Sequence, residues 1–148
     1  MSQPNARTIA GLVAVALPLL LGACGVMSMS GTHPKVPPPG LAPSRCTPGN
    51  CDITVTVTNC TAPGGITVDK PLVEVSTAVN MRWTITPSTF AFAASGIQLD
   101  PPDAQFEVKP SPRPNEFHIH NHKRSNGDFY YYINVQGCAQ ADPFIRNN

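Results

Sequence analysis

The stretch that decides the fold is Ile53-Thr54-Val55-Thr56-Val57-Thr58, in which apolar and polar residues alternate one by one. The segment Val79–Thr86 alternates in the same way, with Met81, Trp83 and Ile85 at its apolar positions. Successive side chains of a β-strand point to opposite faces of the sheet. Each stretch therefore predicts a strand with one buried face and one polar face.

Shorter stretches of the same character follow along the chain, and turn signals separate them, such as residues 63–65, Ser95-Gly96 and Pro101-Pro102. No window of ten or more residues in this region supports an amphipathic helix. We therefore predict an all-β domain over residues 46–148, a single sandwich of seven or eight short strands in two antiparallel sheets, which resembles the immunoglobulin-like or cupredoxin-like outline. The shorter predicted strands are 66–68, 72–75, 90–93, 105–108, 116–122 and 128–135.

The N-terminal 23 residues have the parts of an export signal, with Arg7 ahead of an apolar segment. They end in Leu21-Gly22-Ala23-Cys24, which resembles the lipobox of bacterial lipoproteins. The resemblance covers residues 1–24 only, and it implies cleavage before Cys24 and lipidation of Cys24. The alternatives are an ordinary secretory signal or a retained anchor, although the 16 residues from Thr8 to Ala23 are fewer than the roughly 18 to 20 that cross a bilayer.

Residues 24–45 have no apolar period and contain five prolines, so we expect a semi-stiff tether between the lipid and the domain. Gly25 follows the cysteine, where an aspartate would be the inner-membrane retention signal of enteric bacteria. The resemblance therefore implies a site in the cell envelope, lipid-anchored to the outer membrane and facing the periplasm.

Charge and motifs exclude several classes of function. Without the signal peptide, nine Lys and Arg balance nine acidic residues, which argues against a nucleic-acid partner. Cys138 has no His or Met after it, so a blue-copper site of the cupredoxin kind is not expected.

No serine lies in a Gly-x-Ser-x-Gly elbow and no phosphate-binding glycine loop is present. Asp100, Asp103 and Glu107 surround a double proline and are interpreted as turn residues. We therefore expect no catalytic residues and no cofactor.

The four cysteines of the domain predict two disulfides, as exported domains usually form. If residues 52–58 are one strand, Cys51 and Cys60 lie about 30 Å apart, far beyond the roughly 7 Å between bonded Cα atoms. The chain between Cys46 and Cys51 spans at most about 18 Å. Cys46 therefore cannot cover the distance to Cys60 either. The prediction is therefore Cys46 with Cys51, and Cys60 with Cys138, and the second pair implies that the first and last strands end side by side.

Three of the four histidines, His118, His120 and His122, alternate along one predicted strand and so share one face. Neighbouring members start about 6.6 Å apart, close enough for a His-x-His pair such as His118 and His120 to bind one metal ion. The alternatives are a polar strand face without a ligand and a contact surface for a protein or ligand.

The apolar residues of 116–122 and 128–135 share one face if the two strands form a hairpin with a five-residue loop. This register sets His118 opposite Tyr132 and His120 opposite Tyr130. The sequence thus predicts an outward binding patch of His118, His120, His122, Tyr130 and Tyr132. The function expected from these observations is a non-catalytic binding or assembly module on an envelope lipoprotein, whose partners are the membrane and an envelope protein or ligand. The alternative is a periplasmic metal-binding lipoprotein that uses the histidine strand.

Overall fold

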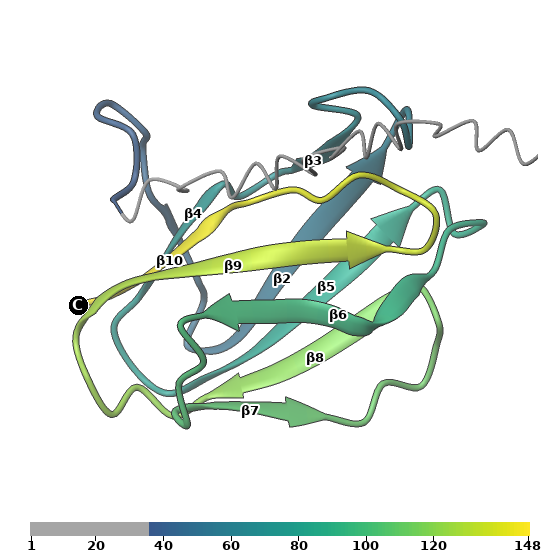
Figure 1. Ribbon diagram of the computed structural model, residues 1–148. Coiled ribbons are helices and arrows are strands. Elements are labelled where there is room, and N and C mark those ends of the chain that lie inside the picture. The colour runs from purple at the N-terminus through teal and green to yellow at the C-terminus, as the bar shows by residue number, and fades with distance from the viewer. Residues whose placement is uncertain (1–35) are drawn as a thin grey trace, which may run out of the picture. The chain divides into compact units, whose positions relative to one another are not determined.

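The structure is a computed structural model that describes residues 36–148. The predicted signal peptide, Cys24 and the first part of the predicted tether lie outside the described residues. Within residues 36–148, ten strands form two five-stranded sheets that face each other, and the predicted all-β sandwich is confirmed (Figure 1). The same residues contain no helix that could span a membrane.

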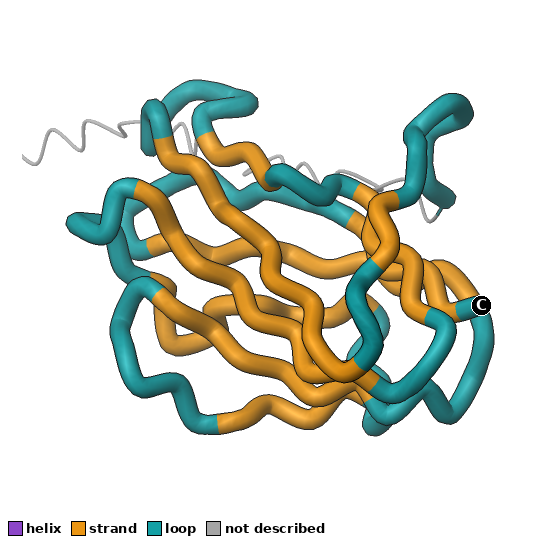
Figure 2. The backbone as a smooth tube through the Cα atoms, turned by 180° about the vertical axis from the view of Figure 1, so that it is seen from behind, coloured by secondary structure: helices purple, strands orange, loops and turns teal. Residues whose placement is uncertain are grey.

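The two sheets are named A and B, and each consists of strands that are far apart in the sequence. Viewed from behind, the described residues are all strand and loop (Figure 2). The strand order in sheet A is β1 (Ser44–Arg45), β4 (Leu72–Val75), β10 (Phe144–Asn147), β9 (Gly127–Val135) and β6 (Phe92–Asp100). The order in sheet B is β3 (Ile66–Val68), β2 (Gly49–Val57), β5 (Val79–Thr86), β8 (Glu116–Asn121) and β7 (Phe106–Lys109).

Both sheets are mixed, and the prediction of purely antiparallel sheets is wrong. Strand β2 pairs with β5 in parallel in sheet B, and β4 pairs in parallel with both β1 and β10 in sheet A. Parallel neighbours need a crossover connection. Here the chain leaves β2, forms β3 beside it and crosses to sheet A as β4, and then returns to sheet B as β5. This detour lets β5 run in the same direction as β2.

The core lies between the sheets and is built from the apolar positions of the alternating strands. Burial alternates along β5, where Met81, Trp83 and Ile85 are almost completely buried. The Trp83 ring meets the Tyr131 ring edge to face at 5.5 Å, and its Nε1 donates a hydrogen bond to the Tyr131 hydroxyl at 3.2 Å. Since Trp83 belongs to sheet B and Tyr131 to sheet A, this pair joins the two layers.

The predicted hairpin between residues 116–122 and 128–135 is wrong. Strand β8 pairs with β5 and β7 in sheet B, whereas β9 pairs with β6 and β10 in sheet A. The segment between them crosses from one sheet to the other. The physical reason is that the apolar faces of β8 and β9 meet across the core. Both strands thus bury their apolar residues without pairing edge to edge.

Both predicted disulfides are confirmed. Cys46 and Cys51 are bonded with Cα atoms 4.9 Å apart, and Cys60 and Cys138 with Cα atoms 4.1 Å apart. The second bond joins the segment after β2 in sheet B to the turn after β9 in sheet A, where Ala139 N also donates to the Cys60 carbonyl at 2.7 Å. The ends of β2 and β9 therefore lie side by side, as predicted, although the two strands belong to different sheets.

Candidate functional site

The outer face of sheet B carries polar side chains in register across four strands. One row is Asn50, Asn80, His120 and Glu107, and the next row is Asp52, Arg82, His118 and Lys109. We call these residues, together with His122, the polar face. On β2, β5 and β8 these residues occupy the polar positions of an alternating strand, and the intervening residues face the core. On β7 the intervening Val108 is itself exposed, and His122 follows directly after β8.

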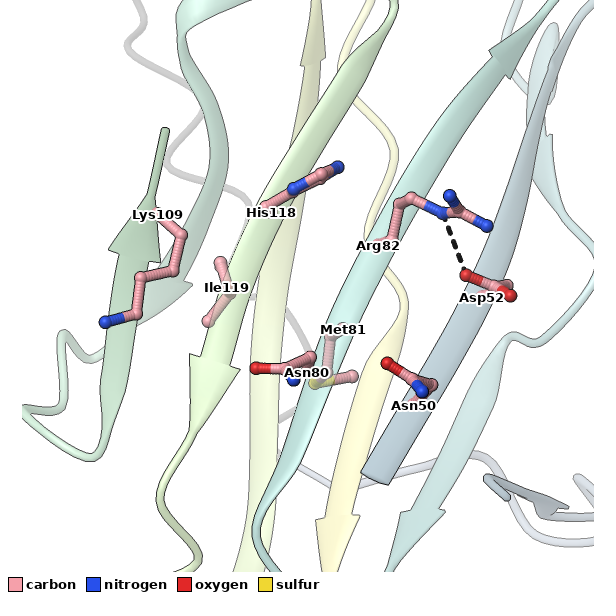
Figure 3. A pocket seen from close by; sticks show the side chains of 8 residues that line it. All are labelled: Asn50, Asp52, Asn80, Met81, Arg82, Lys109, His118 and Ile119. Atoms are coloured by element: carbon pink, nitrogen blue, oxygen red, sulfur yellow. Dashed lines mark hydrogen bonds and ion pairs between the residues drawn. The ribbon is translucent and has the colours of Figure 1, made fainter. Parts of the chain in front are cut away.

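The polar face is hollowed over β2, β5, β8 and β7 (Figure 3). The hollow has a volume of about 640 Å³ and is lined mainly by polar side chains from these strands. Arg82 Nε donates to Asp52 Oδ1 at 2.9 Å, and both side chains are at least half exposed. The backbone N–H of Asn50 donates to the Thr47 carbonyl at 3.2 Å, whereas its side-chain amide makes no hydrogen bond within residues 36–148. The hollow thus offers charged and amide groups that solvent can reach.

The three predicted histidines do share one face, the polar face, but they have different surroundings. His120 Nδ1 lies 2.7 Å from Asn80 Oδ1, and His122 Nε2 lies 3.1 Å from Glu107 Oε2. The His120 and His122 ring centres are 4.5 Å apart. These two rings therefore form a pair, each anchored by a residue of a neighbouring strand.

His118 stands apart from this pair. Its Nε2 lies 3.3 Å from Glu116 Oε2 without the geometry of a hydrogen bond, and this buried nitrogen has no hydrogen-bond partner within the described residues. His118 and His120 are thus directed at different neighbours. Among residues 36–148, no group of three or more His, Cys, Asp and Glu side chains is placed to hold a metal ion.

Glu107, interpreted from the sequence as a turn residue, lies in β7 instead. Hydrogen bonds from Lys109 and then from His122 lower the pKa of the Glu107 carboxyl. The carboxylate therefore stays ionised on the polar face. Asp103 does occupy a turn, since its Oδ1 accepts from the Gln105 backbone N–H at 2.9 Å.

Tyr130 and Tyr132 lie on the outer face of sheet A, so the predicted patch of three histidines and two tyrosines does not form. Tyr130 is buried in an apolar cluster with Leu72 and Phe144, against which Leu41 also packs. The Tyr132 hydroxyl donates to Asp100 Oδ2 at 2.9 Å. The prediction is wrong because it placed β9 beside β8, whereas β9 belongs to the opposite sheet.

Besides Glu107, which was interpreted as a turn residue, sequence reasoning missed five members of the polar face. Asp52, Asn80 and Arg82 were visible as polar positions within predicted strands, but nothing local shows that these strands are neighbours. Asn50 and Lys109 lie outside the predicted strands 52–58 and 105–108 and belong to β2 and β7. The parallel pairing of β2 with β5 brings the first four of them together. The missed residues are Asn50, Asp52, Asn80, Arg82 and Lys109.

No protein-family model matches this chain, and no curated protein matches its sequence.

Proposed function

We propose that the chain is an envelope-anchored lipoprotein whose β-sandwich is a non-catalytic binding module, and that the polar face contacts its partner. The observation that carries this proposal is the difference between the two outer faces of the sandwich. On sheet A, the chain's own Leu41 packs against the cluster of Leu72, Tyr130 and Phe144. On sheet B, the polar face is open and hollowed.

The composition of the polar face favours a hydrated, polar partner surface. Arg82 and Asp52 present opposite charges side by side, and Asn50 and Asn80 add amide donors and acceptors. Such groups favour specific, oriented contact more than high affinity. Six of the eight residues that line the hollow are polar or charged, so we propose an envelope component rich in hydrogen-bonding and charged groups.

The anchoring part of the proposal rests on Cys24 and its resemblance to a lipobox. Acylation at Cys24 with two or more chains would hold the module firmly at the membrane, with the proline-rich segment as its tether. We further propose that this membrane is the outer membrane and that the module faces the periplasm.

Replacing the acceptor thiol tests the anchor. Cys24→Ser keeps the apolar leader but removes the group that receives the lipid, so we expect the protein to leave the detergent phase in phase partitioning. Mass spectrometry of the unchanged protein should show an acylated N-terminal cysteine. An unchanged partition of the variant, or cleavage at another residue, would refute the lipoprotein proposal.

Site-specific photo-cross-linking tests the polar face. A photoreactive amino acid is placed at Asn50 or at Lys109 of the full-length protein, in the bacterium that makes it. The matched control is Gln98, which is exposed on the outer face of sheet A opposite Tyr132. We expect a discrete cross-linked species from the two polar-face positions and a weaker one after Arg82→Ala. Equal cross-linking from Gln98, or none from the polar face, would contradict the proposal.

A further inference from the structure

The histidine pair at the end of β8 has the arrangement of ligands prepared for a metal ion. His120 and His122 approach each other with ring centres 4.5 Å apart, although their positions in an extended strand start about 6.6 Å apart. When an ion is bound through nitrogens at about 2.1 Å each in tetrahedral geometry, the two nitrogens lie about 3.4 Å from each other. The 4.5 Å between the ring centres is compatible with that separation.

The hydrogen bonds around the pair determine which nitrogens are free to coordinate. The Asn80 side-chain oxygen only accepts, so His120 Nδ1 donates to it at 2.7 Å and His120 Nε2 keeps its lone pair. The Glu107 carboxylate also accepts, so His122 Nε2 donates to it at 3.1 Å. The lone pair of neutral His122 is then on Nδ1. Each imidazole thus has one nitrogen fixed by an acceptor and the other available.

This is the pattern found around metal-bound histidines, whose second ring nitrogen usually donates to a carboxylate or a carbonyl oxygen. The acceptor fixes the tautomer and the orientation of the ring and makes the coordinating nitrogen more basic. Glu107 also brings a negative charge beside the pair, which offsets the charge of a cation.

We propose that His120 Nε2 and His122 Nδ1 form an exposed binding site for a divalent transition-metal ion. Water molecules complete the coordination, and Asn80 and Glu107 orient the two ligands. Since affinities of nitrogen sites rise along the first-row series to Cu²⁺, copper binds more tightly than zinc. The site differs from the pair His118 and His120 that strand spacing alone favours, because the His118 nitrogen is turned to Glu116. The inference goes beyond the proposed function and does not rest on it.

Titration of the full-length protein with Cu²⁺ alone tests the site, by calorimetry and by electron paramagnetic resonance. We expect one ion to bind with nitrogen splittings from two imidazoles. His120→Ala and His122→Ala should each weaken binding more than about tenfold, and Glu107→Ala should weaken it about tenfold through the loss of the bond that orients His122. Zn²⁺ should compete with Cu²⁺ only at higher concentration.

His118→Ala is the matched control, because it removes a histidine from the same strand and the same face. It should leave the affinity and the spectrum unchanged. His33, which lies outside the described residues, is kept in every variant and contributes the same background. Thermal unfolding of each variant confirms that the fold is intact. The proposal is overturned if no ion binds, if neither His120→Ala nor His122→Ala weakens binding, or if His118→Ala weakens it equally.

Discussion

The three consecutive tyrosines of β9 all have a pKa above the ordinary value, two of them mainly through burial and the third mainly through a hydrogen bond. Burial raises the pKa of Tyr131, and the distant charge of Asp69 adds to the effect, while the hydrogen bond from Trp83 opposes it. Burial, and then the charges of Asp142 and Asp100, raise the pKa of Tyr130. The hydrogen bond to Asp100 raises the pKa of Tyr132 to about 12. The folded protein therefore holds these phenol protons more tightly than the unfolded chain does.

These shifts predict a loss of stability at alkaline pH. Below the unfolded pKa of about 10 both states are protonated, so the tyrosines contribute no pH dependence there. Above about pH 10 the unfolded state loses protons first, and the free energy of unfolding should fall as pH rises. We expect the tyrosinate absorbance to rise near pH 10 in denaturant and at clearly higher pH in the folded protein. A folded titration that coincides with the denatured one would contradict this.

The side chain of Asn147 holds the last strand through a buried polar network. Its amide nitrogen donates to Gln105 Oε1 at 2.9 Å and to the Ser125 carbonyl at 3.2 Å, and its oxygen accepts from Asn121 Nδ2 at 2.8 Å. Asn147→Ala would leave the buried Asn121 amide nitrogen unsatisfied and remove a bond to the buried Gln105, so we expect a loss of about 2 to 3 kcal/mol in the free energy of unfolding.

Urea denaturation measures this change. Asn126→Ala is the control, because Asn126 is exposed and its oxygen accepts only from the exposed Lys123 side chain. The control should change stability by less than about 0.5 kcal/mol. Equal effects of the two substitutions would show that the network contributes nothing specific.

At the scale of elements, β6 continues as a strand through a glycine at which the sequence predicts a turn. The sequence predicts a turn at Ser95-Gly96, but the structure continues the strand through it, with an irregular register between Phe92 and Ile97. Gly96 has a φ of +24°, and a Cβ there would lie 2.2 Å from ring carbons of Phe117. The missing side chain lets β6 pass close to a ring of the opposite sheet.

Gly96→Ala should therefore destabilise the domain by about 1 to 3 kcal/mol, since the ring of Phe117 must move. That ring packs edge to face on Phe92 at 5.7 Å, so it has little room. Ser95→Ala, at the exposed neighbouring position, is the control and should be nearly neutral. Chemical denaturation of both variants measures the change in stability. An unchanged free energy of unfolding for Gly96→Ala would mean that the irregular segment of β6 adapts freely to the added methyl group.

Alternation along the chain predicts strands and their buried faces, but it does not identify strand partners. Trp83 and His118 are both on the expected side of their strands, because the alternation of side chains between the two faces depends only on local geometry. Tyr130 was placed in the wrong patch because its strand faces β8 across the core instead of pairing with it. Strand β10 was missed because only Phe144 and Ile145 are apolar in it, and its position depends on β4 and β9. Partners are decided by long-range packing, which a short window does not contain.

At the scale of the whole domain, the polar face depends on crossovers between the sheets. Asn50 and Asp52 reach Asn80 and Arg82 only because the chain visits sheet A between β2 and β5. Residues that are 30 positions apart thereby become neighbours, as the ion pair of Asp52 and Arg82 shows. A site assembled in this way has no continuous motif, so the sequence predicted its histidines and not the rest.

The disulfides act at this same scale, and their spacing predicts unequal contributions. Cys60 and Cys138 are separated by 78 positions, whereas Cys46 and Cys51 are separated by 5. A crosslink lowers the entropy of the unfolded chain more when it closes a longer loop, by about 4.5 kcal/mol for the first pair and about 2 kcal/mol for the second. Replacing both cysteines of a pair with alanine avoids a free thiol.

We therefore expect urea denaturation to show a loss near 4 kcal/mol for the pair of Cys60 and Cys138 and about half of that for the pair of Cys46 and Cys51. The bond between Cys60 and Cys138 also joins sheet B to sheet A, beside the backbone hydrogen bond from Ala139 to Cys60. Its removal should consequently increase hydrogen exchange in both layers at that end of the sandwich. Equal losses for the two pairs, or increased exchange in one sheet only, would contradict a role in joining the layers.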